Sequence, residues 1–204
     1  MSTGPAEFEA LVNSRKSVRR FSDAPLELEL VDRLLSTACQ APSAHNRQPW
    51  RFAVLSDFAT RDKLASAMGE NLRADRLADG DDPHEIELDV ERSWNRITGA
   101  PVAILVCLTR EDLDEYPDRD RQDAEVRMAV QGVAMAGGNL LLAAHAHGLG
   151  ACWMCAPLFA QALVVDALDL PTSWEPQGLV LLGWPAGMGK VRNRRPLEEV
   201  AVYL

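Results

Sequence analysis

The feature that most limits how this chain can fold is the unbroken apolar run from Pro101 to Thr109, PVAILVCLT. A run without polar alternation is typical of a central strand buried on both faces. Helical and strand patterns alternate on either side of it, and the helical ones are more extensive. The sequence therefore predicts an α+β fold in which helices flank a central, mostly antiparallel sheet.

The remaining elements are predicted from periodicity, caps and breaks. We expect the whole chain, residues 1–204, to form one domain. Asp23 is the expected cap of the second helix, and Gly148 is the expected end of the long one. The acidic stretch 69–96 is the expected mobile or lid-like segment. The predicted strands lie at 51–55, 101–109, 150–154 and 178–184, and the predicted helices at 7–13, 25–40, 58–68, 123–147 and 157–168.

The predicted helix at 123–147 is unusually rich in alanine and glycine, including Gly132, Gly137 and Gly138. Small side chains allow another element to approach closely, so we place this helix at the centre of the fold or of a dimer interface. Its most apolar part carries Gln131 and Asn139, which favours a buried helix over a membrane span. We expect no membrane partner.

Charge is distributed unevenly over a chain whose net charge is -9. An acidic protein does not suit general nucleic-acid binding, which depends on neutralising phosphates. Two short basic clusters nevertheless stand out near opposite ends. They could form a local anion site if the fold brings them together, or they could be two solvated surfaces. The first, or N-terminal cluster, is Arg15, Lys16, Arg19 and Arg20, and the second, or C-terminal cluster, is Lys190, Arg192, Arg194 and Arg195.

The cysteines and histidines give no pattern of metal ligands, so no metal site is predicted. Cys152 and Cys155 form a C-x-x-C without a second pair, and we favour an inert interpretation over a redox or zinc one. Nothing indicates a disulfide framework or a signal peptide at the N-terminus. A reducing cytoplasm is the expected location.

The loop Ala41–Trp50, APSAHNRQPW, places short polar groups between prolines directly after a predicted helix. Such a loop holds its hydrogen-bond donors stiffly, which suits a planar heteroaromatic ligand with acceptors at its edge. A rigid structural turn is the alternative. His45 could donate a proton in such a site, although a polar residue that satisfies the loop backbone is the simpler interpretation.

In combination, these segments resemble the nitroreductase family. RKSVRRF, followed about two dozen residues later by PSAHNRQPWRF, resembles its N-terminal signature. GLGACW at 148–153, NLLLAA at 139–144 and RRPLEEV at 194–200 resemble later segments in the same order. The resemblance covers essentially the whole chain.

The resemblance implies an intertwined homodimer with two FMN sites at its interface and a small-molecule substrate. Arg15, Lys16, Ser17 and Arg19 should contact the FMN phosphate and ribityl chain, with Arg192 and Arg194 reaching the same phosphate. No side chain is required as a nucleophile. The residues expected along the flavin ring are Pro42, Ser43, Ala44 and His45, from the partner subunit, and Trp153, Met154, Cys155 and Ala156, with the backbone N–H of Cys155 facing flavin N5.

The implied activity is ping-pong hydride transfer from NAD(P)H through FMN to a nitroaromatic, a quinone or a related conjugated compound. No G-x-G-x-x-G indicates a Rossmann site, so the nicotinamide would bind transiently. A further resemblance, through YPD at 116–118 and LPTSWEPQG at 170–178, is to the reductase domain of the bacterial two-domain enzyme that builds the deazaflavin coenzyme. A free-standing deazaflavin-precursor reductase and a non-catalytic flavin- or deazaflavin-binding module are therefore alternatives.

Overall fold

The structure is a computed structural model that describes residues 4–187 and 189–204. At its centre lies β2 (Val102–Thr109), in which every residue is buried. This agrees with the prediction from the apolar run. Because both faces of the strand are covered, its side chains do not alternate between buried and exposed positions.

Three further strands complete one four-stranded sheet in the order β1-β2-β4-β3. They are β1 (Trp50–Leu55), β3 (Gly150–Met154) and β4 (Trp174–Gly183). All three pairings are antiparallel, so the predicted fold class is confirmed. The β2–β4 register shifts at Val106 and Cys107, where Gln177 becomes an extra residue on β4. β4 also begins at Trp174, four residues before the predicted start.

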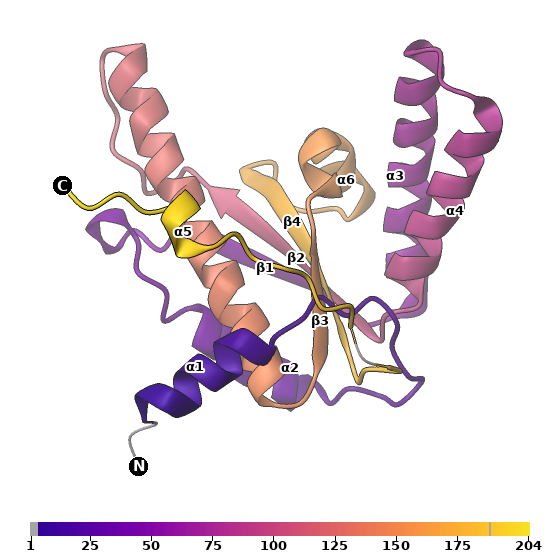
Figure 1. Ribbon diagram of the computed structural model, residues 1–204. Coiled ribbons are helices and arrows are strands. Elements are labelled where there is room, and N and C mark those ends of the chain that lie inside the picture. The colour runs from indigo at the N-terminus through magenta and orange to yellow at the C-terminus, as the bar shows by residue number, and fades with distance from the viewer. Residues whose placement is uncertain (1–3, 188) are drawn as a thin grey trace.

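Helices cover both faces of the sheet (Figure 1). On one face, α2 and the long α5 pack over the core that includes Val106 and Val180. On the other face, α3 and α6 pack over the core that includes Leu105 and Leu181, and α4 lies beside α3. The α-helices are α1 (Pro5–Ser14), α2 (Leu28–Ala38), α3 (Phe58–Ala78), α4 (Pro83–Thr98), α5 (Arg119–Ala146) and α6 (Gln161–Ala167).

The long helix α5 begins at an Asp118 cap, whose carboxylate accepts a hydrogen bond from the N–H of Arg121. It ends as predicted before Gly148, which has a φ of +75° and so takes the left-handed conformation that glycine adopts without strain. By length and composition α5 could cross a membrane, a test that core helices also pass. Here Ala136 and Leu140 are fully buried in the core, which agrees with the interpretation as a buried helix.

Two predicted helices differ in the structure. α2 begins after an N-cap at Glu27 rather than at Asp23, because the preceding residues run extended and Leu26 is buried in the core. The predicted helix at 157–168 is divided into a 3-10 turn, η2 (Ala156–Phe159), and α6. The division lies at Ala160, whose φ of -143° is not helical.

The acidic stretch 69–96 forms regular structure. Its first part extends α3 to Ala78, and its last part forms α4 after a turn at Gly80, where φ is +83°. Ion pairs cross the two helices, with Arg73 bound to Glu87 at 2.6 Å and Arg76 bound to Asp89 at 2.6 Å. The pair stands away from α5 at the other side of the sheet (Figure 1).

Candidate functional site

The N-terminal basic cluster lies along the outer edge of the sheet. α1 ends where Arg15 turns extended, and Ser17 then pairs with Ala151 of β3. The N–H of Val18 donates to the carbonyl of Ala151 at 3.0 Å. The edge of β3 therefore fixes the backbone of the cluster.

The C-terminal segment returns to the same place. After β4, the N–H of Ala186 donates to the carbonyl of Arg20 at 3.0 Å. At Gly189 the chain passes so close that a Cβ there would lie 3.0 Å from the Cβ of Lys16 and 3.0 Å from the carbonyl oxygen of Ser17. The two ends of the chain therefore run side by side, as a shared anion site requires.

Between these segments lies a cavity of about 1120 Å³, here called the cationic cavity. Its cationic side chains are Arg19, Arg20, Arg92, Arg96, Lys190 and Arg192, and its lining also includes Ser17, Val18, Leu88, Glu91, Asn95, Ala186, Gly187 and Gly189. Apart from Arg92, none of these cations has a carboxylate within 4.0 Å in the described part of the chain. A set of unpaired guanidinium groups beside a hydroxyl is the chemistry that binds phosphate oxygens.

Three predicted phosphate ligands do not line this cavity. Arg15 and Lys16 lie next to it near the end of α5, where they and partial burial lower the pKa of His145, with burial as the larger cause. His145 Nε2 lies 2.8 Å from the hydroxyl of Ser14. Arg194 instead donates to the carbonyl of Arg192 at 3.1 Å, within its own segment.

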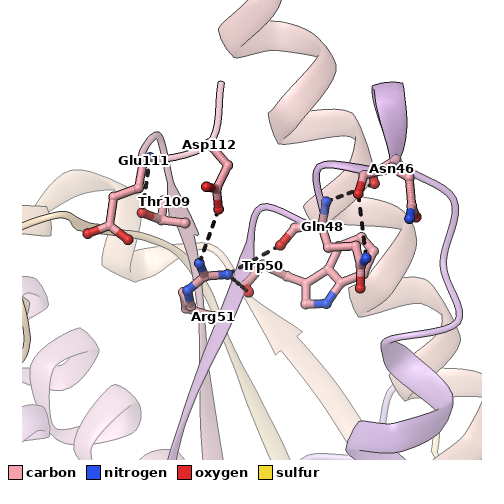
Figure 2. A network of polar contacts seen from close by, with 8 residues as sticks. Asn46, Gln48, Trp50, Arg51, Thr109, Glu111 and Asp112 are labelled. Carbon is pink, nitrogen blue, oxygen red and sulfur yellow. Dashed lines mark hydrogen bonds and ion pairs between the residues drawn. The ribbon is translucent and has the colours of Figure 1, made fainter. Parts of the chain in front are cut away.

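The loop that contains Pro42, Ser43, Ala44 and His45 is fixed by its own hydrogen bonds (Figure 2). The N–H of Gln48 donates to the hydroxyl of Ser43 at 3.0 Å. Arg51 donates to the carbonyl of Gln48 at 3.2 Å and pairs with Asp112 at 3.8 Å. The loop is thus held between strand β1 and the connection that follows β2.

A second ion pair anchors the same loop. Arg47 binds Asp114, whose N–H donates at 3.4 Å to the carboxylate of Glu125 on α5. The Glu125 side chain is buried, and its Oε2 has no hydrogen-bond partner in the described structure.

Backbone strain also marks this loop. His45, Asn46 and Gln48 have φ values of 50°, 54° and 50°, in the left-handed region that non-glycine residues rarely adopt. Such conformations cost roughly 1–3 kcal/mol each and gather at functional sites. The surrounding hydrogen bonds offset this cost and leave the loop preshaped.

Within one chain, this loop and the basic clusters do not meet. Ser43 packs on α5 at Gly132, where a Cβ would lie 3.3 Å from the Cβ of Ser43. Ser14, which precedes the N-terminal cluster, contacts α5 at His145. Thirteen residues of helix separate the two positions, or about 20 Å at 1.5 Å per residue. The two segments of one chain therefore contact α5 at well-separated positions.

The segment Trp153–Ala156 forms the end of β3 and the start of η2. The Trp153 ring fills a slot between α5 and β4, where a Cβ on Gly137 or on Gly178 would lie 2.3 Å from ring carbons. Its Nε1 donates to the sulfur of Cys155 at 3.2 Å. Gly132 and Gly137 of α5 thus admit the Ser43 loop and a tryptophan ring.

Trp153 and Cys155 line a second hollow of about 340 Å³, here called the apolar cavity. Its other walls come from α5, Leu158 and the bulged residue Gln177. Met154 and Ala156 instead pack against the core on the opposite face of the sheet. Of the four predicted residues, only two therefore border this hollow.

The cysteines show no sign of a metal or redox centre. All four are free, and no group of three His, Cys, Asp or Glu residues suited to a metal occurs among the described residues. Burial raises the pKa of the Cys107 thiol to about 12 and also raises that of Cys152. Both thiols are therefore protonated near neutral pH.

Three residues that sequence reasoning missed come from α4. Arg92, Asn95 and Arg96 line the cationic cavity together with residues of both basic clusters. Their spacing of three and four places them on one helical face. That spacing was visible in the sequence, but nothing in it indicated that this face of α4 borders the basic clusters.

Several proteins are similar to this chain in sequence or in fold. A 5,6-dimethylbenzimidazole synthase of Rhodospirillum rubrum is 31% identical, over 98% of this chain and 92% of its own length. An NADH dehydrogenase of Thermus thermophilus is 31% identical, over 93% and 92%. A solved structure from Desulfovibrio desulfuricans, assigned as a nitroreductase and in complex with FMN, is 29% identical, with a TM-score of 0.75 over 100% of this chain and 98% of the other.

The fold and these relatives define the class of the protein, an FMN-dependent oxidoreductase. The model of the nitroreductase family matches residues 12–184, which include the N-terminal cluster and all four strands. The chain belongs to the nitroreductase family.

Proposed function

We propose that this protein holds FMN between two copies of the chain and passes hydride, in a ping-pong cycle, from NAD(P)H to a small conjugated acceptor such as a quinone or nitroaromatic. One observation supports this most strongly: the two basic clusters, about 170 residues apart in sequence, meet around one cavity. The donor set fits a phosphate monoester, since it combines guanidinium forks, an ammonium and a hydroxyl.

In this proposal the FMN phosphate lies where the two ends of the chain meet. Ser17, Arg19 and Arg192 contact it directly from the cavity wall. Arg15 and Lys16 add positive potential from the neighbouring backbone turn, and Arg194 acts from the same C-terminal segment. These groups position the cofactor and neutralise its charge, and none of them takes part in the hydride transfer.

The flavin ring is proposed to lie between one chain's Cys155 and its partner's Pro42–His45 loop. This supports a homodimer, because the loop is about 20 Å along α5 from the basic cluster of its own chain. The exposed side chains of Val130 and Met135 on α5 offer apolar surface for a second copy.

When bound, FMN supplies the hydride-accepting ring. The chain contributes orientation and electrostatics. The backbone N–H of Cys155 would be the donor toward flavin N5, and the Trp153 ring, whose Nε1 donates to the Cys155 sulfur, would help to hold the turn that presents this N–H. The Ser43 hydroxyl accepts a hydrogen bond from the N–H of Gln48 and so helps to hold the loop in shape.

Two alternatives keep support from particular residues. The segment at 170–178, which carries Trp174 at the start of β4, supports a reductase of a deazaflavin precursor. A non-catalytic flavin- or deazaflavin-binding module would use the same cavity without turnover. The four free cysteines suit any of these roles in a reducing cytoplasm.

Reduction of the purified, FMN-loaded protein distinguishes these functions. Bleaching of the flavin absorbance by NADH or NADPH, followed by recovery with a quinone, would support the proposed cycle. Bleaching by dithionite alone, with tight deazaflavin binding, would favour an alternative, and turnover of the dehydro precursor would then identify the reductase. A protein that cannot be loaded with FMN at all would refute the proposal.

A further inference from the structure

The cationic cavity carries more positive charge than one phosphate monoester neutralises. Its lining holds six cationic side chains against the single carboxylate of Glu91. A phosphate monoester carries at most two negative charges. The excess of positive charge remains even if Arg92, which binds Asp89, is not counted.

Two of the six cations, Arg92 and Arg96, lie on α4 rather than in the two basic clusters. Leu88, Arg92 and Arg96 follow one another at intervals of four and so share one face of the helix. From Arg96 to Leu88 this face extends for about 12 Å, at 1.5 Å per residue. It therefore forms a wall long enough to contact a second group beyond the FMN phosphate.

Arg96 is the member of this wall best placed to bind an anion. It is half-buried, yet no carboxylate lies within 4.0 Å of it in the described residues. Burial raises the pKa of the Cys152 thiol, and Arg19 and Arg96 both lower it by a smaller amount, so both side chains lie near this residue of β3. A partly buried guanidinium without a counterion is costly, and a bound anion removes that cost.

Arg92 adds a second, weaker contact one turn further out. Its Nη1 binds Asp89 at 2.7 Å, which leaves the rest of the guanidinium fork directed to the cavity that it lines. Arg92 and Arg96 are four residues apart, so their Cβ atoms lie roughly 5–6 Å apart and both side chains can bind the same phosphate group.

The size of the cavity agrees with two ligands. Its volume of about 1120 Å³, in a hollow that is open to solvent, leaves room for a group besides the FMN phosphate. FMN with its phosphate at the basic clusters would leave the α4 side available.

We propose that Arg96 and Arg92 form a second phosphate subsite, which binds the 2′-phosphate of NADPH. This rests on the proposed function and makes NADPH, rather than NADH, the preferred electron donor. Arginine is the residue that commonly accommodates this 2′-phosphate, because its fork matches the oxygens of a monoester. Leu88 and Asn95 on the same face then border the adenosine.

A binding experiment without hydride transfer tests the subsite. Adenosine 2′-monophosphate and adenosine 5′-monophosphate are titrated into the FMN-loaded protein by calorimetry. The variants are Arg96→Gln, Arg92→Gln and, as a matched control, Arg33→Gln on the exposed side of α2. We expect the 2′-phosphate to bind at least 10-fold more tightly than the 5′-phosphate, with a loss of about 10-fold in Arg96→Gln, less in Arg92→Gln and none in Arg33→Gln.

Rapid reduction of the bound FMN provides the second arm. Wild type should show a lower apparent Kd for NADPH than for NADH, and in Arg96→Gln measured at saturating FMN that difference should disappear. Equal affinity of wild type for the two donors, or equal weakening of both by Arg96→Gln, would overturn the subsite. Loss of FMN from Arg96→Gln without a donor effect would also overturn it and assign Arg96 to the cofactor. Failure of the proposed function is separate, because wild type would then hold no FMN or would not be reduced by either donor.

Discussion

The two cavities of this protein are built in opposite ways. The cationic cavity is assembled from three segments distant in sequence, and its charged side chains are mostly exposed and unpaired. The apolar cavity is formed by α5, β3 and β4, where the Trp153 ring fits against two glycines without spare room. Ligand binding in the cationic cavity is therefore expected to depend on charge more than on shape. The apolar cavity has no charged side chain in its lining, so its properties depend on packing.

The largest expected difference concerns cysteine reactivity. With its pKa at about 12 rather than the ordinary 9.0, Cys107 has about 1000-fold less thiolate at pH 8. Cys155 is exposed and borders the apolar cavity. Iodoacetamide followed by peptide mass spectrometry should label Cys155 and leave Cys107 and Cys152 unlabelled in the native protein freed of FMN. Rapid labelling of Cys107 without denaturant would show that the core is more open than the structure.

The tightness of the apolar cavity is tested by two adjacent glycines of α5. Gly137→Ala places a Cβ 2.3 Å from the Trp153 ring, and overpacking of this kind costs about 1–3 kcal/mol. Gly138→Ala meets nothing within 4 Å and should be neutral or stabilising in a helix. Urea denaturation of both variants measures the difference. If both have the wild-type midpoint, the ring is free to move and the contrast between the cavities is wrong.

The dependence of the cationic cavity on charge is tested within the C-terminal cluster. Arg192 lines the cavity, whereas Arg194 binds a carbonyl of its own segment. Arg192→Ala should weaken FMN binding about 10-fold, since one charge-assisted hydrogen bond is worth roughly 1.5–3 kcal/mol before screening by salt. Arg194→Ala should weaken FMN retention less, and neither variant should change the melting temperature much, because both side chains are exposed. Unchanged FMN affinity in both variants would remove this cluster from the phosphate site.

The smallest expected effect is a dependence of stability on pH. The pKa of His145 is lowered in the folded apoprotein, first by burial and then by Arg15 and Lys16. The unfolded chain therefore binds the proton more tightly, so stability should decrease as pH falls through about 6.5, the unfolded pKa. His145→Gln should reduce this decrease in urea titrations at pH 7.5 and 5.5. An identical slope in the variant would show that other groups cause it.

The sequence predicted the fold better than it predicted the site. The run at 101–109 indicated the central strand, and Gly148 indicated the end of α5, because burial and helix termination are encoded locally. The α4 contribution was missed because it depends on tertiary packing that brings Arg96 beside the basic clusters, and no local pattern encodes that packing. The start of α2 was wrong because the burial of Leu26 outweighed the capping signal at Asp23.

The left-handed residues at 45, 46 and 48 have a consequence for anyone who redesigns this protein for heat resistance. Glycine at these positions would release the strain of each φ near 50° and so lower the free energy of the folded state. The same replacement would give the unfolded chain more freedom and would let the loop sample other shapes, so binding would then have to restore an order that the wild-type loop already has. A glycine variant of this loop is therefore expected to bind the ligand that packs against the loop more slowly or more weakly than wild type does.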